Sequence, residues 1–176
     1  ITCLRDYPKD FVRAVNLVNP RLLSIFIAAY QSYLWNEMAK EFVKLYISQS
    51  ELMRFYNSAV EMFFYKSLPV SLFQEFLSVL IPLVDHKVEF RDLKIRKIAR
   101  RVIEQEGVEI ENFRLNKIKR AFFKSVLRKV IAIPEELKVS ETSPDEINTG
   151  KFKLTISFEL PSGSYASVLI RRLGVV

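Results

Sequence analysis

The chain contains one cysteine, one histidine and four glycines among its 176 residues, and these shortages exclude several classes of protein. A single cysteine, Cys3, cannot form an internal disulfide, and together with the lone His86 it offers too few ligands for a zinc site. One histidine and no GxSxG turn leave a Ser/His/Asp triad unsupported. The scattered glycines form no phosphate loop. We therefore expect chemistry without a metal or any other cofactor.

Long apolar runs are also missing. The longest, Ile25 to Tyr30, is far shorter than the roughly 20 residues that a membrane-spanning helix needs. No secretory signal is visible, so the sequence predicts a cytoplasmic protein without a membrane partner. The chain opens with ITCLRDYP and no methionine. We expect it to be a fragment, a processed piece or the ordered part of a longer protein.

Positive charge is abundant. The chain has 27 lysines and arginines against 20 acidic residues, a formal net charge of +7 and a pI near 9.5. This balance favours an acidic partner, with nucleic acid ahead of a membrane surface. The alternative is that the lysines only solvate the faces of the protein.

The first strong helix signal is Asn19 as a cap followed by Pro20, and the predicted helix runs to about Tyr46. It is apolar nearly all round from 22 to 30, which predicts a central, buried helix. Gln31, Ser32 and Asn36 interrupt it with polar groups that need hydrogen-bond partners when buried. The structural alternative is that they bind a neighbouring loop or strand end.

Two more helices and a basic amphipathic helix are predicted next. Ser48 and Glu51 indicate a capping box for a helix that runs to about Lys66 and has Phe55, Ala59, Met62 and Phe63 on its inner face. Val70 to Leu80 forms a further short helix. From 91 to 103, cations lie opposite apolar residues, a pattern suited to docking on a core while facing phosphate.

Between 113 and 129, phenylalanines alternate with lysines and arginines, a composition that can grip unstacked nucleotides, although such aromatics are more often core. Residues 125–133 and 137–139 are β-rich, and 140–150 predict a surface loop. Phe152, Leu154, Ile156 and Phe158 alternate with polar residues and predict a strand with one buried face. Pro161 and Gly163 end this strand, and Ser164 can cap a helix from Tyr165.

We therefore predict an α+β fold, in which an antiparallel sheet from the C-terminal half packs against an N-terminal helical group, with an inserted helical region. The predicted division is a catalytic-type α+β domain from residues 1–49 and 107–176, and an inserted, mostly helical subdomain from residues 50–106.

Two motifs resemble those of the TruD family of tRNA pseudouridine synthases. The segment AYQSYLWN (29–36) is similar to the family's AYQSYLFN element, with tryptophan for phenylalanine. The segment LPSGSYAS (160–167), followed by Arg171, resembles LPxGSYATxxLRE, with Ser167 for threonine and Arg172 for glutamate. Looser matches cover 107–113 and 128–134. The resemblance implies an incomplete pseudouridine-synthase-like fold that isomerises a tRNA uridine, at the thirteenth nucleotide by family, without a cofactor.

The resemblance also suggests site residues. The expected uridine-binding residues are Gln31, Asn36, Leu160, Pro161, Gly163, Ser164 and Tyr165. The expected RNA-backbone-binding residues are Arg114, Arg120, Arg128 and Arg171.

No catalytic residue is identified. The family's aspartate lies in a GxKDxxAxTxQ element, and the Lys9–Asp10 pair lacks the threonine and glutamine that follow it, so we interpret Asp10 as an ordinary carboxylate. Two alternatives remain open: a non-catalytic RNA-binding module that keeps the scaffold without the nucleophile, and a helical protein-interaction domain.

Overall fold

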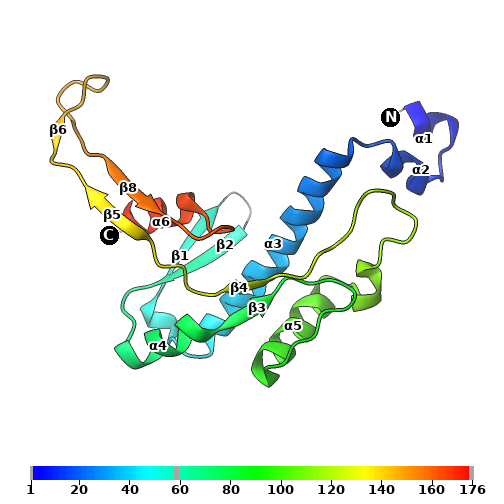
Figure 1. The fold of residues 1–176 in the computed structure, drawn as a ribbon, viewed down its shortest axis with the longest axis horizontal. Coiled ribbons are helices and arrows are strands. Elements are labelled where there is room, and N and C mark those ends of the chain that lie inside the picture. The colour runs from blue at the N-terminus through cyan, green and yellow to red at the C-terminus, as the bar shows by residue number, and fades with distance from the viewer. Residues whose placement is uncertain (1, 58–59, 175–176) are drawn as a thin grey trace. The chain divides into compact units, whose positions relative to one another are not determined.

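The structure, a computed structural model, describes residues 2–57 and 60–174 and forms two compact units, residues 1–130 and 131–176 (Figure 1). The helices and strands of the first unit are α1 (Thr2–Asp6), α2 (Phe11–Asn16), α3 (Pro20–Lys44), η1 (Gln49–Glu51), β1 (Leu52–Asn57), β2 (Val60–Tyr65), α4 (Val70–Ser78), β3 (Leu80–Pro82), α5 (Leu93–Gln105), η2 (Ile110–Phe113) and β4 (Leu127–Lys129). The second unit contains β5 (Glu135–Val139), β6 (Ser143–Pro144), β7 (Phe152–Lys153), β8 (Ile156–Glu159) and α6 (Ala166–Gly174).

Helix α3 begins where the cap signal predicts. The side chain of Asn19 accepts a hydrogen bond from the backbone N–H of Arg21, and Pro20 occupies the first turn, where its missing N–H costs nothing. The prediction of a central, buried helix fits the second half of α3 but not the apolar stretch from which it was argued. Leu22, Ile25 and Phe26 are exposed, and the buried positions begin at Ile27, because the hydrogen bonds and ion pairs that join α3 to later segments run from Gln31 to Glu41.

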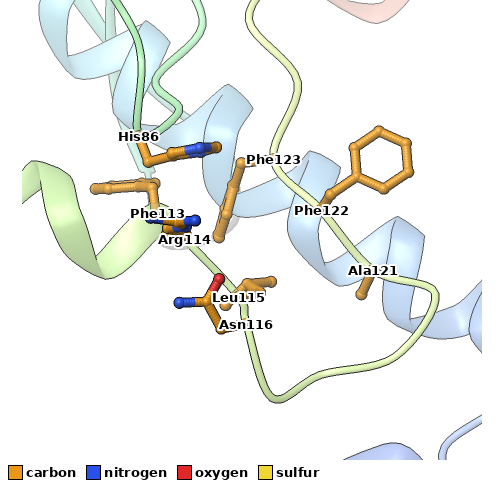
Figure 2. A pocket seen from close by; sticks show the side chains of 8 residues that line it. All are labelled: His86, Phe113, Arg114, Leu115, Asn116, Ala121, Phe122 and Phe123. Carbon is orange, nitrogen blue, oxygen red and sulfur yellow. The ribbon is translucent and has the colours of Figure 1, made fainter.

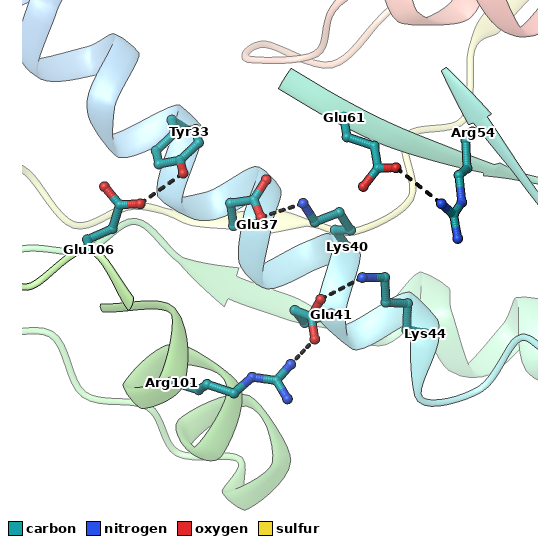
Figure 3. Close-up of polar contacts among 9 residues, drawn as sticks. All are labelled: Tyr33, Glu37, Lys40, Glu41, Lys44, Arg54, Glu61, Arg101 and Glu106. Carbon is teal, nitrogen blue, oxygen red and sulfur yellow. Dashed lines mark hydrogen bonds and ion pairs between the residues drawn. The ribbon is translucent and has the colours of Figure 1, made fainter. Parts of the chain in front are cut away.

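Helix α5 lies antiparallel to that second half. Lys94 bonds Tyr46 just beyond the end of α3. Arg101 pairs with Glu41, and Glu106 bonds Tyr33 (Figure 3). The predicted amphipathic helix is confirmed: Asp92 caps its first turn, and the residues that it buries are Ile95, Ile98, Ala99, Val102 and Ile103. The exposed face carries the cations.

The helix predicted from 48 to 66 is wrong. Strands β1 and β2 form an antiparallel hairpin in which Phe55 pairs with Met62. The rings of Phe55 and Phe64 stack with centroids 4.1 Å apart, and both side chains are buried. A dense run of aromatic residues favours strands, since flat rings pack well across a pleated surface. Ala59, which the helix prediction placed on an inner face, lies outside the described residues.

The short helix predicted from Val70 is confirmed as α4, which ends at Ser78. Strand β3 follows it and pairs antiparallel with β4, from the β-rich segment after residue 125. This ladder joins two segments that are more than 40 residues apart and places both beside α3.

In the second unit, β5 pairs antiparallel with β8 and β6 pairs with β7, as expected for an antiparallel arrangement in the C-terminal half. The predicted continuous strand is broken between β7 and β8, and the alternation does not bury one face throughout. Phe152 and Leu154 are exposed, whereas Ile156 and Phe158 are half-buried. Only the two later side chains lie on the strand that is paired with β5.

The α+β class is confirmed. Instead of one sheet, the described residues contain four two-stranded antiparallel ladders, two in each unit. None of the helices in the described part of the chain combines the length and apolar character needed to cross a bilayer.

Candidate nucleic-acid interface

The AYQSYLWN segment anchors the β3–β4 region to α3. Gln31 Nε2 donates to the backbone carbonyl oxygens of Val84, at 2.8 Å, and Lys124, at 3.1 Å. One turn on, Trp35 Nε1 donates to the carbonyl oxygen of Ile81 at 3.0 Å. The polar groups of this helix therefore bind later segments of the chain, which is the structural alternative that the sequence left open.

Gln31 is 5% exposed, and both of its amide N–H groups are used by these carbonyls. Asn36 is half-buried. Five helical residues correspond to a rotation of about 140° around the axis. Gln31 and Asn36 therefore lie on different faces of α3.

A surface cavity of about 200 Å³ opens beside the segment that follows α5 (Figure 2). Its lining residues are His86, Phe113, Arg114, Leu115, Asn116, Ala121, Phe122 and Phe123. The chain reaches it through Gly107, whose φ of +66° is the left-handed conformation that glycine adopts without strain, and then through η2. Asn112 accepts a hydrogen bond from the Glu109 N–H and closes the η2 turn.

Stacked rings hold the floor of this cavity in place. Phe113 is 3% exposed; its ring stacks on Tyr30 of α3 with centroids 6.2 Å apart and meets Phe123 edge-on at 4.9 Å. Phe122, by contrast, is 70% exposed. The cavity thus combines a rigid aromatic floor with an aromatic ring that is open to solvent.

Two tyrosines behind the floor have raised pKa values. The hydroxyl of Tyr33 donates to a carboxylate oxygen of Glu106 at 2.8 Å, and this bond raises the pKa of Tyr33 to about 12. Burial, with the same carboxylate nearby, raises the pKa of Tyr30. Both hydroxyls therefore stay protonated at neutral pH and serve as fixed donors rather than as bases.

The segment that borders the cavity on one side carries charge of one sign. The segment 114–124 contains no acidic residue, and its exposed cations are Arg114, Lys117, Lys119, Arg120 and Lys124. Asn16 of α2 fixes the segment: its Nδ2 donates to the carbonyl of Lys117, and its Oδ1 accepts from the N–H of Lys119. Aromatic rings beside cations and an amide suit a nucleobase with its attached phosphate.

The predicted RNA-binding arginines separate into different environments. Arg114 lines the cavity, and Arg120 is exposed next to it with a φ of +58°. Arg128 of β4 is half-buried, and its Nη1 donates to Ser32 Oγ at 3.3 Å. Arg171 belongs to α6 in the second unit.

The predicted LPSGSYAS corner forms a turn in the second unit. Ser164 N–H donates to the Pro161 carbonyl at 3.1 Å, and Gly163 has a φ of +87°, which explains the glycine. Leu160 is half-buried, Tyr165 is 46% exposed, and α6 begins one residue after it. A pocket shared by this corner and Gln31 stays a prediction, since the two lie in different units.

Sequence reasoning missed His86 and Asn116 as neighbours of Arg114. The interleaved aromatic and basic residues after 113 signalled this region, but only folding brings residue 86 to it. Asp10 accepts a hydrogen bond from the N–H of Arg13 and caps α2, which agrees with its interpretation as an ordinary carboxylate. Among the residues that the structure describes, no cluster of histidine, cysteine and acidic side chains could hold a metal ion.

The positive charge and the cavity of aromatic rings beside cations fit an RNA-directed protein, and comparison with known proteins specifies the family. The family described as tRNA pseudouridine synthase D (TruD) matches residues 1–173. The chain therefore belongs to the TruD family.

Individual relatives agree. The assigned tRNA pseudouridine synthase D 2 of Methanocaldococcus jannaschii is 36% identical over 94% of this chain and 39% of its own length. The corresponding D 1 protein of Methanococcus maripaludis is 33% identical over 95% of this chain and 42% of its own. A crystal structure of the assigned TruD of Methanosarcina mazei superposes with a TM-score of 0.67 at 25% identity, over 99% of this chain and 43% of that one. The chain thus spans about two fifths of the length of these relatives.

Proposed function

We propose that the protein containing this chain isomerises a uridine of tRNA to pseudouridine, at the thirteenth nucleotide as the family resemblance implies. Family membership over residues 1–173 supports the reaction class. The observation that carries the proposal for this chain is the cavity at Phe113 and Arg114, where exposed and buried rings meet a wholly cationic segment. Base extrusion needs such surroundings, because the flipped nucleotide loses its stacking partners and keeps its phosphates.

In this reaction an aspartate attacks the flipped uridine, and the base detaches, rotates and rejoins through carbon. Asp10 caps α2, and the complete GxKDxxAxTxQ element is absent from this sequence, so we expect the nucleophile outside these 176 residues. The chain's role is then to hold the nucleotide and its backbone. The reaction needs no cofactor.

The roles proposed for individual residues follow from their surroundings. Arg114 and Arg120 bind phosphate beside the cavity, and Arg171 does so from α6. The family resemblance adds Asn36 and the residues from Leu160 to Tyr165 as proposed uridine contacts. Gln31 and Arg128 contribute by holding the β3–β4 region against α3, since their described bonds are to this chain.

The domain division belongs to the same proposal. Residues 1–49 and 107–176 would form part of the catalytic-type domain, and residues 50–106, which include the β1–β2 hairpin and α5, would be the inserted subdomain. The protein would act in the cytoplasm, where tRNA is its partner.

The test uses the intact gene product with tRNA transcripts, and chemical detection of pseudouridine by carbodiimide-induced stops in reverse transcription. We expect a stop at one uridine. Arg114→Gln should weaken tRNA binding by about three- to tenfold, because it removes one phosphate contact. Arg54→Gln, which removes an exposed guanidinium from the β1–β2 hairpin, is the matched control and should change affinity less than about twofold.

Each outcome separates the alternatives. tRNA binding without isomerisation by the intact protein would contradict the enzyme and favour the non-catalytic module. No RNA binding at low salt would favour a protein-interaction domain. Equal effects of the two substitutions would refute the cavity as the contact site.

A further inference from the structure

A second hollow, of about 560 Å³, lies between the C-terminal end of α3 and the first half of α5, and we call it the α3–α5 groove. Its cations are Lys94, Lys97 and Arg101 of α5. Spacings of three and four residues place these three side chains on one helical face, with about 5–6 Å between the Cβ atoms of successive members of the row. The groove is separate from the cavity at Phe113 and shares no lining residue with it.

The groove has an apolar side as well as a cationic one. Ile98 forms part of its floor, and Leu45 is 58% exposed beside it. Tyr46 supplies an aromatic ring that is held by Phe42, at 5.1 Å between centroids, and by Phe76, at 5.4 Å. A rigid ring and an open leucine next to a row of cations match the two chemistries of an unpaired nucleotide, which are an apolar base and an anionic phosphate.

Existing contacts orient two of the cations without neutralising the groove. Lys94 Nζ donates to the Tyr46 hydroxyl at 2.8 Å, which raises the pKa of Lys94 and keeps it charged. Glu41 pairs with Arg101 and also with Lys44 (Figure 3). Glu41 is the one carboxylate lining the groove, against three cations, so a positive excess faces solvent.

Lys97 is the cation best placed for a ligand. It is exposed at the centre of the row, and it forms no ion pair with any residue that the structure describes. Its neighbour Arg100 lies outside the groove, is 82% exposed and pairs with Glu104 at 2.7 Å. The two side chains carry the same charge on the same helix, but Lys97 lines the groove, whereas Arg100 does not and is paired with Glu104.

The groove and the cavity are held at a fixed separation by α3. Tyr30 stacks behind the cavity floor, and Glu41 and Tyr46 line or border the groove. Glu41 and Tyr46 are 11 and 16 residues from Tyr30 on or just beyond one helix, which corresponds to about 17 and 24 Å along the helix axis. One RNA molecule of tRNA size can therefore reach both sites at once.

We propose that the α3–α5 groove is a second RNA-binding site, which holds the backbone of an unpaired stretch of the same tRNA whose uridine is modified. Its cations bind successive phosphates, and Tyr46 with Leu45 receives a base or ribose. This proposal rests on the proposed function for the identity of the RNA. The groove contributes affinity and leaves the chemical step unchanged, because it is remote from the cavity.

The test compares Lys97→Gln with Arg100→Gln in the intact gene product, with tRNA binding measured by filter retention and isomerisation measured at saturating tRNA. Lys97→Gln should weaken binding by about three- to tenfold and lower the slope of log affinity against log salt by about one, whereas Arg100→Gln should change affinity less than twofold. The maximal rate should be the same in both variants. Lys97→Arg should restore binding, because it keeps the charge.

Equal losses in both variants would overturn the site, since they would show only a general field of charge. An unchanged affinity for Lys97→Gln would overturn it as well and would favour a protein ligand for the groove. A selective loss of tRNA binding in a protein that makes no pseudouridine would support the groove while contradicting the proposed reaction, so the two failures are distinguishable.

Discussion

Gln31 donates both of its amide hydrogens to backbone carbonyls from two later segments, at Val84 and Lys124. A buried carbonyl that loses its donor costs about 1–3 kcal/mol, because water cannot replace the bond. The sequence indicated that the polar groups in this helix needed partners, and it could not indicate which residues would supply them. The partners are 53 and 93 positions away along the chain.

Gln31→Leu is therefore expected to lower the free energy of unfolding by about 2–3 kcal/mol, because it leaves two carbonyls without donors while keeping an apolar side chain of similar size. Urea unfolding followed by circular dichroism measures the change. The control is Gln74→Leu, which replaces an exposed glutamine of α4 and should stay within about 0.5 kcal/mol of the wild type. Coincident unfolding curves for the two variants would show that the Gln31 bonds contribute nothing.

At the scale of elements, α5 is aligned along α3 by contacts at Tyr46, Glu41 and Tyr33. The bond between Tyr33 and Glu106 joins the two helices next to the cavity. Glu106 caps the end of α5, and Tyr33 lies one turn from Tyr30, whose ring stacks on the cavity floor. This alignment links the groove at one end of α5 to the cavity at the other.

The pH dependence of stability tests this helix contact. The ordinary pKa of tyrosine is about 10, and that of Tyr33 in the folded protein is about 12. Between these values the folded state keeps a proton that the unfolded state has lost, so the contribution of this bond is complete below about pH 10 and declines as the pH rises toward 12. Tyr33→Phe should remove that decline and should cost about 0.5–1 kcal/mol at neutral pH, since the bond is partly exposed.

The measurement is the difference in free energy of unfolding between wild type and Tyr33→Phe at about pH 9 and about pH 11, in which the titration of other groups cancels. The difference should shrink at the higher pH. Tyr7→Phe, which keeps the contact of the ring with Arg13, serves as the control for removing a tyrosine hydroxyl. A constant difference for Tyr33→Phe would contradict the assignment.

The elements also show where local patterns were sufficient. Helices α3 and α5 were predictable because their caps, Asn19 and Asp92, and their 3.6-residue periodicity lie within each segment. The β1–β2 hairpin was predicted as a helix, because apolar residues at Phe55 and Met62 fit helical spacing as well as cross-strand pairing. Local spacing could not separate the two.

At the scale of the whole molecule, the net charge of +7 has two interpretations, RNA binding or simple solvation of the surface. The cations of the segment 114–124 and of the α3–α5 groove gather beside aromatic side chains in both places. Scattered solvating charges would not be expected to coincide with hollows and rings, which favours the first interpretation.

The salt dependence of tRNA affinity distinguishes these interpretations. With about four to six phosphates neutralised, the slope of log affinity against log salt should be about −3 to −5. Because the cavity and the groove are well separated, the double variant Arg114→Gln with Lys97→Gln should reduce the steepness by about two, the sum of the single effects. A slope near zero for the wild type would mean that the charges only solvate the surface.

The sequence by itself determined the start of α3 at its Asn19 cap, the α+β class, the excess of positive charge and the two motifs that indicated the TruD family. These depend on residue type and on near neighbours, so they can be read from a single chain. Only the tertiary structure decided that half of α3 is exposed, that residues 52–65 form a hairpin, and that His86 meets Arg114. Those outcomes depend on contacts between segments tens of residues apart, whose strength no local pattern records.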